Sequence, residues 1–338
     1  MKALPHIRKI FWAVLLPVSF LWAMLTWMRR RWYPISLRFK ATVPVLCIGN
    51  LHCGGSGKTP LVVEVGHYFT DANPIILSRG YRGKISKKGG VLNRQQGNGA
   101  ELFGDEPWML SQLLPNKIVI GRDRVARLKE IESEGRPVIL DDGFQHLSVL
   151  PHCSIIVINS DYSPDDAFCL PLGELREPLS ALKEASAVVL TQGESAKGAQ
   201  CWRGLLTQAF PGVCVFDAKR INGGVWDADQ EVHLPEGAMV GAFSGIAHPR
   251  GFVESLGQKA KVGWSVDYED HQKYSGKQLQ ALLDRKNRTN VAALVTTEKD
   301  WFKVNRWFKE RGERVLRLRI RYEIPGEFWY FLKKHWVN

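Results

Sequence analysis

The stretch GNLHCGGSGKT, residues 49–59, decides the fold. It follows VPVLCIG (residues 43–49), an apolar run typical of a buried strand, and precedes a segment over residues 58–69 whose apolar spacing is typical of a helix. A glycine-rich turn between a strand and a helix presents backbone N–H groups and a helix N-terminus to an anion. The sequence therefore predicts a loop that binds the phosphates of a nucleotide.

The residues of this loop have separate expected roles. In the pattern GxxxxGK[ST] the lysine reaches the β- and γ-phosphates and the hydroxyl binds Mg²⁺, which assigns these roles to Lys58 and Thr59. The match is incomplete, because the first glycine of the pattern falls at His52, so a plain left-handed turn is the alternative. The expected nucleotide-binding residues are Asn50, Gly54, Gly55, Ser56, Gly57, Lys58 and Thr59.

A second part of the site is expected in VILDDGFQH, residues 138–146. An apolar strand that ends in acid is how phosphate-loop proteins hold Mg²⁺. Asp141 and Asp142 would repel each other unless a cation or a donor lies close by, and which of them binds Mg²⁺ is left open. A solvated turn is the alternative for this pair, and His146 either orients the aspartates or satisfies a buried turn.

Short apolar runs separated by helical lengths recur along the chain and predict parallel strands with crossover helices. They cover residues 74–78, 117–121, 137–141, 154–158, 187–191, 213–218, 238–243, 291–296 and 314–320. We expect an α/β protein with a P-loop NTPase-like core of mostly parallel sheet (residues 33–212) and a smaller second α/β domain (residues 213–338) joined by a two-strand hinge. Residues 83–104 are expected to form a long surface loop, and residues 221–230 a turn between two extended arms.

The N-terminal segment IFWAVLLPVSFLWAMLTWM, residues 10–28, contains no charge. As a helix it would be about 28 Å long, close to the thickness of the hydrocarbon core of a bilayer. Three arginines follow it, which favours placing the rest of the chain in the cytoplasm. We expect residues 1–32 to form a membrane anchor helix, whether spanning or lying in one leaflet; a buried core helix is the alternative.

Composition narrows the choice of partners. The chain has 338 residues, 45% of them hydrophobic, and a formal net charge of +12, which excludes wholesale disorder and suggests a polyanionic partner. The basic residues are not interleaved with a recognisable DNA or RNA module, so no nucleic acid is expected. Six scattered cysteines without a CxxC pair argue against a structural zinc and for a reducing compartment.

Cys53 has an expectation of its own, because it lies inside the glycine-rich loop, near Lys58 and a helix N-terminus. Such surroundings favour a reactive thiolate. We therefore expect alkylation of Cys53 to block the site and a bound nucleotide to protect it. The alternative is an inert, small packing residue.

Several motifs taken together resemble one family. They are GNLHCGGSGKTP (49–60), SRGY (78–81), GDEP (104–107), DDGFQH (141–146), LPLGELREP (170–178), the DH of YEDHQKY (268–274) and TTEKD (296–300). In this order the sequence resembles the tetraacyldisaccharide 4′-kinases, the membrane-associated kinases of lipid A synthesis. LPLGELREP departs from the more usual PAGPLREP, and Gln272 replaces the second histidine of a DHH-like motif, which affects only the expected substrate contacts.

The resemblance implies a reaction and a place for it. The reaction is transfer of the γ-phosphate of ATP, with Mg²⁺, to the 4′-hydroxyl of a tetraacylated glucosamine disaccharide 1-phosphate, an anionic lipid, and the product is lipid IVA. The place is the cytoplasmic face of the bacterial inner membrane. By resemblance Asp105 is the base and His271 adjusts its proton affinity. The alternatives are that Asp105 caps a helix beginning at Glu106 and that His271 is a surface histidine.

The full expected catalytic set joins Asp105 and His271 to Lys58, Asp142 and His146 of the loop and the acidic strand end. Candidate substrate contacts follow strand ends, where ligands bind in open parallel sheets. Arginine suits the substrate 1-phosphate because its planar fork binds phosphate bidentately; ordinary surface charge is the alternative. These candidates are Arg79, Tyr81, Arg122, Arg124, Arg176 and Glu177.

Residues 297–300 either contact the nucleotide or pack the hinge, and residues 328–336 are expected to pack on the core rather than on lipid.

One competing hypothesis is a membrane-associated ATPase switch of the deviant P-loop type. GGSGKT fits that class, but Cys53 stands where its signature lysine would precede the paired glycines. Such a protein would hydrolyse ATP without any sugar lipid, which makes the two hypotheses distinguishable.

Overall fold

The computed structural model describes residues 5–95, 99–192, 196–247 and 249–337. Its strands are β1 (Val45–Asn50), β2 (Ile75–Ser78), β3 (Gly90–Val91), β4 (Ile118–Ile120), β5 (Val138–Asp141), β6 (Cys153–Asn159), β7 (Ala187–Gln192), β8 (Cys214–Asp227), β9 (Gln230–Glu231), β10 (Met239–Ser244), β11 (Lys261–Asp267), β12 (Ala293–Thr297) and β13 (Val315–Glu323). Its α-helices are α1 (Pro5–Trp32), α2 (Lys58–Tyr68), α3 (Gly99–Phe103), α4 (Asp105–Leu113), α5 (Arg124–Ile131), α6 (Ala196–Ala209), α7 (Pro249–Gly257), α8 (Gly276–Thr289), α9 (Glu298–Lys309) and α10 (Gly326–Leu332).

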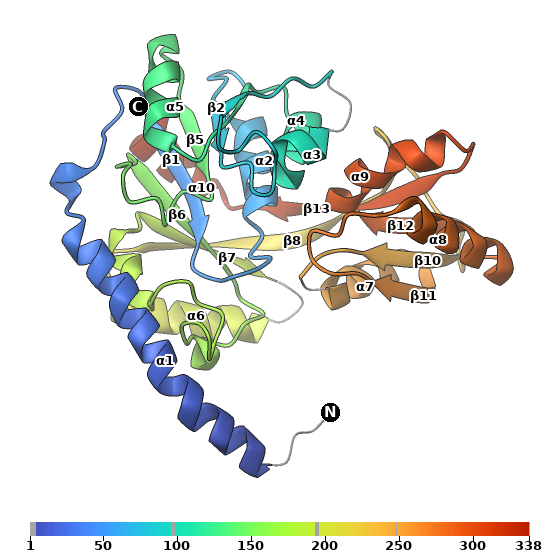
Figure 1. The fold of residues 1–338 in the computed structure, drawn as a ribbon, viewed down its shortest axis with the longest axis horizontal. Helices are drawn as coiled ribbons and strands as arrows, with labels where there is room; N and C mark the ends of the chain where they lie inside the picture. Colours follow the sequence, from blue (N-terminus) through green and yellow to red (C-terminus); the bar gives the residue numbers. More distant parts are fainter. Residues whose placement is uncertain (1–4, 96–98, 193–195, 248, 338) are drawn as a thin grey trace.

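All the strands belong to one mixed sheet, with helices on both faces (Figure 1). The order is β11-β10-β12-β13-β8-β7-β6-β1-β5-β2-β4-β3, and β9 pairs with β8. The pairs β8–β13, β8–β9 and β3–β4 are antiparallel, whereas the other pairs run parallel. The expected α/β class with a mostly parallel sheet is confirmed.

Each face of the sheet is covered because the strands are apolar on both sides. In the N-terminal half, α2, α4 and α10 bury Leu61, Leu110 and Phe328 against one face, while α5 and α6 bury Leu128 and Trp202 against the other. In the C-terminal half, α8 and α9 cover one face and α7 covers the other. Buried helices on both faces explain why these strands appear in the sequence as unbroken apolar runs.

β8 and β13 connect the two halves of the molecule (Figure 1). β8 is a 14-residue strand that pairs with β7 through its first part and with β13 through its second. The expected turn over residues 221–230 is therefore wrong: strand continues to Asp227, and only Ala228 and Asp229 turn toward β9. Gly224 adopts φ +89°, and a side chain at this position would meet Glu231 of β9. The paired glycines therefore let β9 approach β8 closely.

Other departures from the expected elements are local. The segment over residues 83–104 is not wholly a loop, because it contains β3, α3 and the start of the turn into α4. The edge strand β11 was not expected, because its exposed positions and Gly263 give it a weak apolar signal. The C-terminal segment packs on the core as expected, with Phe328, Leu332 and Trp336 buried.

The N-terminal helix α1 lies along the outside of the molecule (Figure 1). Many of its apolar side chains are exposed, among them Phe20 at 72%, so it is not a core helix. Ser19 and Arg30 face inward and are buried. Within the described ranges, no helix has both the length and the hydropathy required to span a membrane.

Candidate functional site

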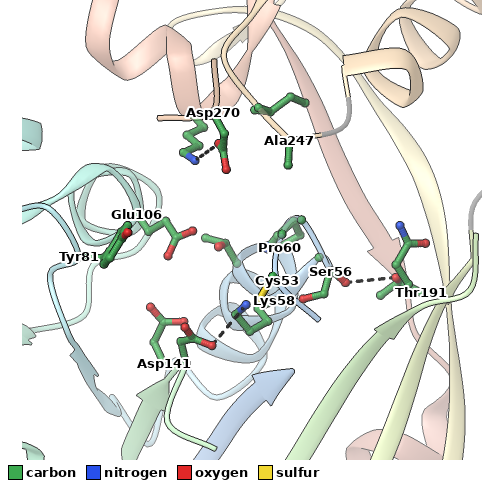
Figure 2. A pocket seen from close by; sticks show the side chains of 18 of the residues that line it. Cys53, Ser56, Lys58, Pro60, Tyr81, Glu106, Asp141, Thr191, Ala247 and Asp270 are labelled. Carbon is green, nitrogen blue, oxygen red and sulfur yellow. Dashed lines mark hydrogen bonds and ion pairs between the residues drawn. The ribbon is translucent and has the colours of Figure 1, made fainter. Parts of the chain in front are cut away.

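The carboxyl ends of the central parallel strands open into one large cavity. The neighbours of β1 are β5 on one side and β6 on the other, which is the arrangement that leaves a crevice at the carboxyl edge of a sheet. A cavity of about 1330 Å³ lies there. Side chains from the C-terminal half, including Asp270, close its other side (Figure 2).

The glycine-rich loop lines this cavity between β1 and α2. Gly57 precedes α2 at φ +86°, and a Cβ on it would lie 2.0 Å from the Tyr322 hydroxyl, so both conformation and space require glycine. The Ser56 carbonyl accepts a hydrogen bond from the Thr191 hydroxyl at 3.3 Å, which ties the loop to β7 (Figure 2). The loop residues that line the cavity are Gly54, Gly55, Ser56, Gly57, Lys58 and Thr59.

Two residues at the loop behave differently from their neighbours. Asn50 is fully buried and is not among the residues that line the cavity; its amide donates to the His52 carbonyl at 2.8 Å and so shapes the loop from behind. Cys53 lines the cavity and is partly exposed, next to Arg176. The structure therefore leaves the thiol accessible to reagents that enter the cavity.

The two aspartates after β5 have opposite environments. Asp141 is buried, and its Oδ2 accepts from the Ser78 hydroxyl at 3.0 Å, whereas Oδ1 meets no donor among the described residues. Burial, together with the carboxylates of Glu106 and Asp142, raises the pKa of Asp141 to about 7. An acid held in this way favours either a proton or a cation at the site.

Asp142 lies 3.4 Å from Lys58 Nζ and 3.1 Å from Arg176 Nη1. Burial alone would raise its pKa, but these two cations outweigh burial and hold the pKa of Asp142 below its usual value. The residue adopts φ +50°, a conformation that non-glycine residues rarely adopt and that is concentrated at functional sites.

Asp105 and His271 come from opposite halves of the molecule and meet beside the cavity, which His271 lines and Asp105 does not. His271 Nδ1 lies 3.1 Å from Asp105 Oδ2, and His271 also adopts a left-handed φ of +61°. Asp105 is the first residue of α4 and makes no capping bond; the N-cap is Gly104, so the capping alternative is wrong. Glu106 follows it and lines the cavity on the side of Asp141 (Figure 2).

A lysine that no sequence motif indicated also contacts this pair. Lys303 Nζ lies 2.9 Å from Asp105 Oδ2 and 3.2 Å from Oδ1 of the fully buried Asp300. Asp300 in turn accepts from the backbone N–H of Gly245 and the hydroxyl of Thr297. The only sequence signal was the spacing of three residues between Asp300 and Lys303 on one helix face.

Residues 297–300, which were expected either to contact the nucleotide or to pack the hinge, lie in two different environments. Thr297, Glu298 and Lys299 line the cavity, whereas Asp300 supports the fold beneath it. Lys299 Nζ lies 3.2 Å from Asp270 and 3.4 Å from His271 Nε2, so it adds a cation beside the histidine.

The remaining candidates reach the cavity with one exception. Arg79, Tyr81, Arg122, Arg124, Arg176 and His146 line it. Glu177 does not: it is buried against Arg30 of α1, and the geometry gives it an ion-pairing role. Burial, followed by the charge of Arg124, lowers the pKa of His146 to about 4, so its imidazole is neutral at pH 7, with Nε2 2.8 Å from the Ser148 hydroxyl.

Metal ligands are few in this site. In the part of the chain that the structure describes, no group of three His, Cys, Asp or Glu side chains is arranged to hold a metal ion. An ion held here would therefore take part of its coordination from a ligand or from water, as Mg²⁺ commonly does.

The sheet and its cavity define the class of this protein: it is an α/β protein with a large cavity at the carboxyl edge of a mostly parallel sheet, which is where open sheets of this kind bind ligands. A family model described as Tetraacyldisaccharide-1-P 4'-kinase matches residues 11–336. The chain therefore belongs to the tetraacyldisaccharide-1-P 4'-kinase family, and the resemblance found in its motifs is confirmed.

Individual relatives agree with this membership. The chain is 32% identical over 283 residues to a tetraacyldisaccharide 4'-kinase of Desulfotalea psychrophila, covering 79% of this chain and 80% of the relative. It is 34% identical over 267 residues to a tetraacyldisaccharide 4'-kinase of Bradyrhizobium diazoefficiens, covering 78% and 75%. Its fold is similar to that of LpxK from Aquifex aeolicus, a crystal structure of an "apo" form in complex with ATP, with a TM-score of 0.72 and 27% identity over 94% of this chain and 96% of that one.

Proposed function

We propose that this protein transfers the γ-phosphate of ATP to the 4′-hydroxyl of a tetraacyldisaccharide 1-phosphate, forming lipid IVA in lipid A synthesis. The observation that carries the proposal is the contact between Asp105 and His271, because His271 lines the same cavity as the loop of Lys58. Phosphoryl transfer needs a held phosphate chain and a poised acceptor hydroxyl. The cavity offers a group for each task in a chain that belongs to a family of kinases.

The glycine-rich loop suits the phosphates of ATP in a P-loop type of site. Its backbone N–H groups and the N-terminus of α2 supply partial positive charge. Lys58 begins that helix and lines the cavity, so its ammonium reaches toward the β- and γ-phosphates in this proposal. The ion pair with Asp142 keeps Lys58 in place when no nucleotide is bound.

Mg²⁺ fits the oxygens at this edge of the sheet. The buried Oδ1 of Asp141 meets no hydrogen-bond donor among the described residues. A hard cation would give this oxygen a partner. Thr59, Asp141 and Asp142 would hold the ion, with phosphate oxygens and water completing its shell. When bound, Mg²⁺ neutralises charge that develops on the transferred phosphoryl group.

Asp105 serves as the base in the proposed step. Its Oδ1 takes the proton of the 4′-hydroxyl as that oxygen bonds to the γ-phosphorus, while the bond from phosphorus to the β–γ bridging oxygen breaks and ADP leaves. His271, bonded to Oδ2, orients the carboxylate. Because the two residues come from different halves, the pair assembles only when both halves close on the cavity.

The acceptor side of the cavity suits an anionic sugar lipid. Arg79, Arg122 and Arg124 follow strands β2 and β4, and their guanidinium groups match a sugar phosphate. The arginine side chains would bind the 1-phosphate, and Tyr81 would pack against a sugar ring.

The exposed apolar face of α1 would lie in the membrane that holds the lipid. Phe20, Leu25 and Trp27 on that face are more than half exposed, and an exposed apolar helix face of this kind suits the boundary between headgroups and acyl chains. We place the protein at the cytoplasmic face of the bacterial inner membrane, where it meets both ATP and the lipid.

We also propose that residues 33–212 and 213–338 act as two domains hinged on β8 and β13, with α10 of the second unit returning to pack on the first. Separate apolar clusters support the division, because those of the second unit draw mainly on residues 225–318. The sheet continues from one unit to the other through β8, which pairs with β7 of the first unit and with β13 of the second.

The test is a transfer assay with detergent-solubilised protein, Mg²⁺, γ-labelled ATP and tetraacyldisaccharide 1-phosphate. We expect label in the lipid, and its loss in Lys58→Ala. ATP hydrolysis without labelled lipid would overturn the proposal in favour of an ATPase switch.

A further inference from the structure

The end of α1 is built into the turn that bears the two aspartates. Arg30 is buried, and its Nη2 donates to the Phe144 carbonyl at 3.0 Å. Its Cζ also lies 4.2 Å from the centroid of the Phe144 ring. Beside it, Arg29 donates to the Gln145 carbonyl at 3.0 Å. Two adjacent residues of the helix therefore hold two adjacent carbonyls of the turn.

The same guanidinium faces a second turn at the cavity. Its Nε donates to Glu177, which is itself buried, and its Nη1 donates to Glu184 at 3.0 Å. Arg176, next to Glu177, forms the ion pair with Asp142. Trp22 lies on α1, N-terminal to Arg30, and its indole N–H donates to the Arg176 carbonyl at 3.0 Å. One buried arginine thus connects α1 to both turns that surround Asp142.

We propose that Arg30 is a positioning residue for phosphoryl transfer: it holds the turn over residues 141–146 in its catalytic geometry and so couples α1 to the reaction centre. This inference rests on the proposed function. Its physical basis is the fixed fork of guanidinium, which reaches a carbonyl and two carboxylates at once, as an ammonium on a flexible stem does not.

The turn needs such support because of its backbone. Asp142 adopts φ +50°, a conformation that persists only when the surrounding structure holds it. A Cβ on Gly49 would lie 2.6 Å from Cβ of Phe144, so the turn is also pressed closely on β1. A shift of Phe144 would therefore move Asp141 and Asp142, and small displacements at a reacting centre are costly.

Arg30 faces inward, whereas the apolar face of α1 faces outward. A role in positioning is thus separable from a role in membrane binding, because detergent micelles can satisfy the outer face in every variant. Arg31 is the matched control, since it is the next residue, carries the same charge and is exposed.

The experiment compares Arg30→Lys, Arg30→Met, the pair Arg30→Met with Glu177→Met, and Arg31→Met in one detergent. The paired variant removes the buried carboxylate that Arg30→Met leaves alone, and Glu184 keeps its partner Arg38 at 2.6 Å. We expect the paired variant to regain the thermal midpoint of the wild type, while kcat stays about tenfold to a hundredfold lower at unchanged lipid KM. Arg31→Met should match the wild type.

Amide hydrogen exchange over residues 141–146 gives a readout that needs no turnover. We expect faster exchange there in Arg30→Lys and in the paired variant, and none of this change in Arg31→Met. Recovery of kcat together with the thermal midpoint in the paired variant would overturn the inference, as would unchanged exchange in the turn. Lack of lipid phosphorylation by the wild type would contradict only the proposed function, because hydrogen exchange in the turn is measured without turnover.

Discussion

The ammonium of Lys303 lies 2.9 Å from Oδ2 of Asp105, the oxygen that also accepts the bond from His271. Both donors come from the C-terminal half of the chain, and both meet the carboxylate at the start of α4. Oδ2 is therefore occupied, and Oδ1 is the oxygen of Asp105 that remains for an acceptor hydroxyl. The two contacts therefore orient the Asp105 carboxylate and also stabilise its charged form.

The first prediction concerns the base itself. Asp105→Asn keeps the shape of the side chain but removes its capacity to take a proton, so we expect kcat to fall about 100- to 10,000-fold while ATP binding persists. Label transfer to the lipid and equilibrium binding of ATP are the two measurements. Glu101→Gln, which alters an exposed acid paired with Lys84, is the control. Turnover near that of the wild type in Asp105→Asn would remove Asp105 as the base.

The second prediction is a shift in pH dependence. Burial alone would raise the pKa of Asp105, but the bond from His271 and the charge of Lys303 outweigh it and hold the pKa below its usual value. Lys303→Met removes that charge, so the base becomes protonated at higher pH, and the acid limb of kcat/KM should move to higher pH. Lys303→Arg keeps the charge and should retain the acid limb of the wild type.

The control for this series is Lys309→Met, an exposed lysine on the same helix. Stability gives an independent check: a carboxylate with a lowered pKa stabilises the fold above about pH 4, and this contribution is lost as the pH falls through its folded pKa. Lys303→Met should therefore lose stability at neutral pH and lose less of it on acidification than the wild type. An unchanged acid limb in Lys303→Met would show that Lys303 does not act on the base.

The central features of the fold were predictable because local sequence determines them. The strand before residue 49, the glycine-rich turn and the helix after it follow from apolar spacing and from the absence of a side chain at Gly57. The acidic end of β5 is likewise local, since Asp141 and Asp142 adjoin an unbroken apolar strand. Such segments need no knowledge of the rest of the chain.

The contacts that the sequence did not predict join residues far apart along it. Arg30 meets Glu177 and Lys303 meets Asp105 only because the sheet order brings their elements together. Glu177 was expected at the substrate, yet a buried carboxylate needs a partner, and α1 supplies one. The second part of β8 was expected to be a turn because the paired glycines after Asn222 are also residues that favour turns, whereas its first part was expected as a strand.

The third prediction follows from the proton affinity of Asp141. Its raised pKa of about 7 lies above the value of about 3.9 expected in the unfolded chain. Between these values the folded protein binds more protons than the unfolded one, so this group lowers the free energy of unfolding as the pH rises from about 4 to about 7. Mg²⁺ favours the charged carboxylate, and its stabilising effect should be larger at pH 7 than at pH 5.

Thermal unfolding at both pH values, with and without Mg²⁺ and in the absence of nucleotide, checks this prediction. Asp141→Asn should reduce the decrease in stability that accompanies the rise in pH, and it should remove most of the stabilisation by Mg²⁺. Asp284→Asn, a substitution of an exposed aspartate on α8, should change neither. An equal Mg²⁺ effect at both pH values in the wild type would contradict the assignment of Asp141 as a ligand.

The fourth prediction concerns Cys53 in the glycine-rich loop. The thiol lines the cavity beside the proposed phosphate site, so a group attached to it would occupy space that ATP requires there. We expect a small alkylating reagent to abolish lipid phosphorylation and ATP to slow the loss. Cys201 and Cys214 are exposed and would react as well, so the experiment uses a background in which both are serine. In that background Cys53→Ser should keep its activity in the presence of the reagent. Inactivation that continues at the same rate in Cys53→Ser, or that ATP does not slow, would show that the phosphates bind elsewhere than against this loop.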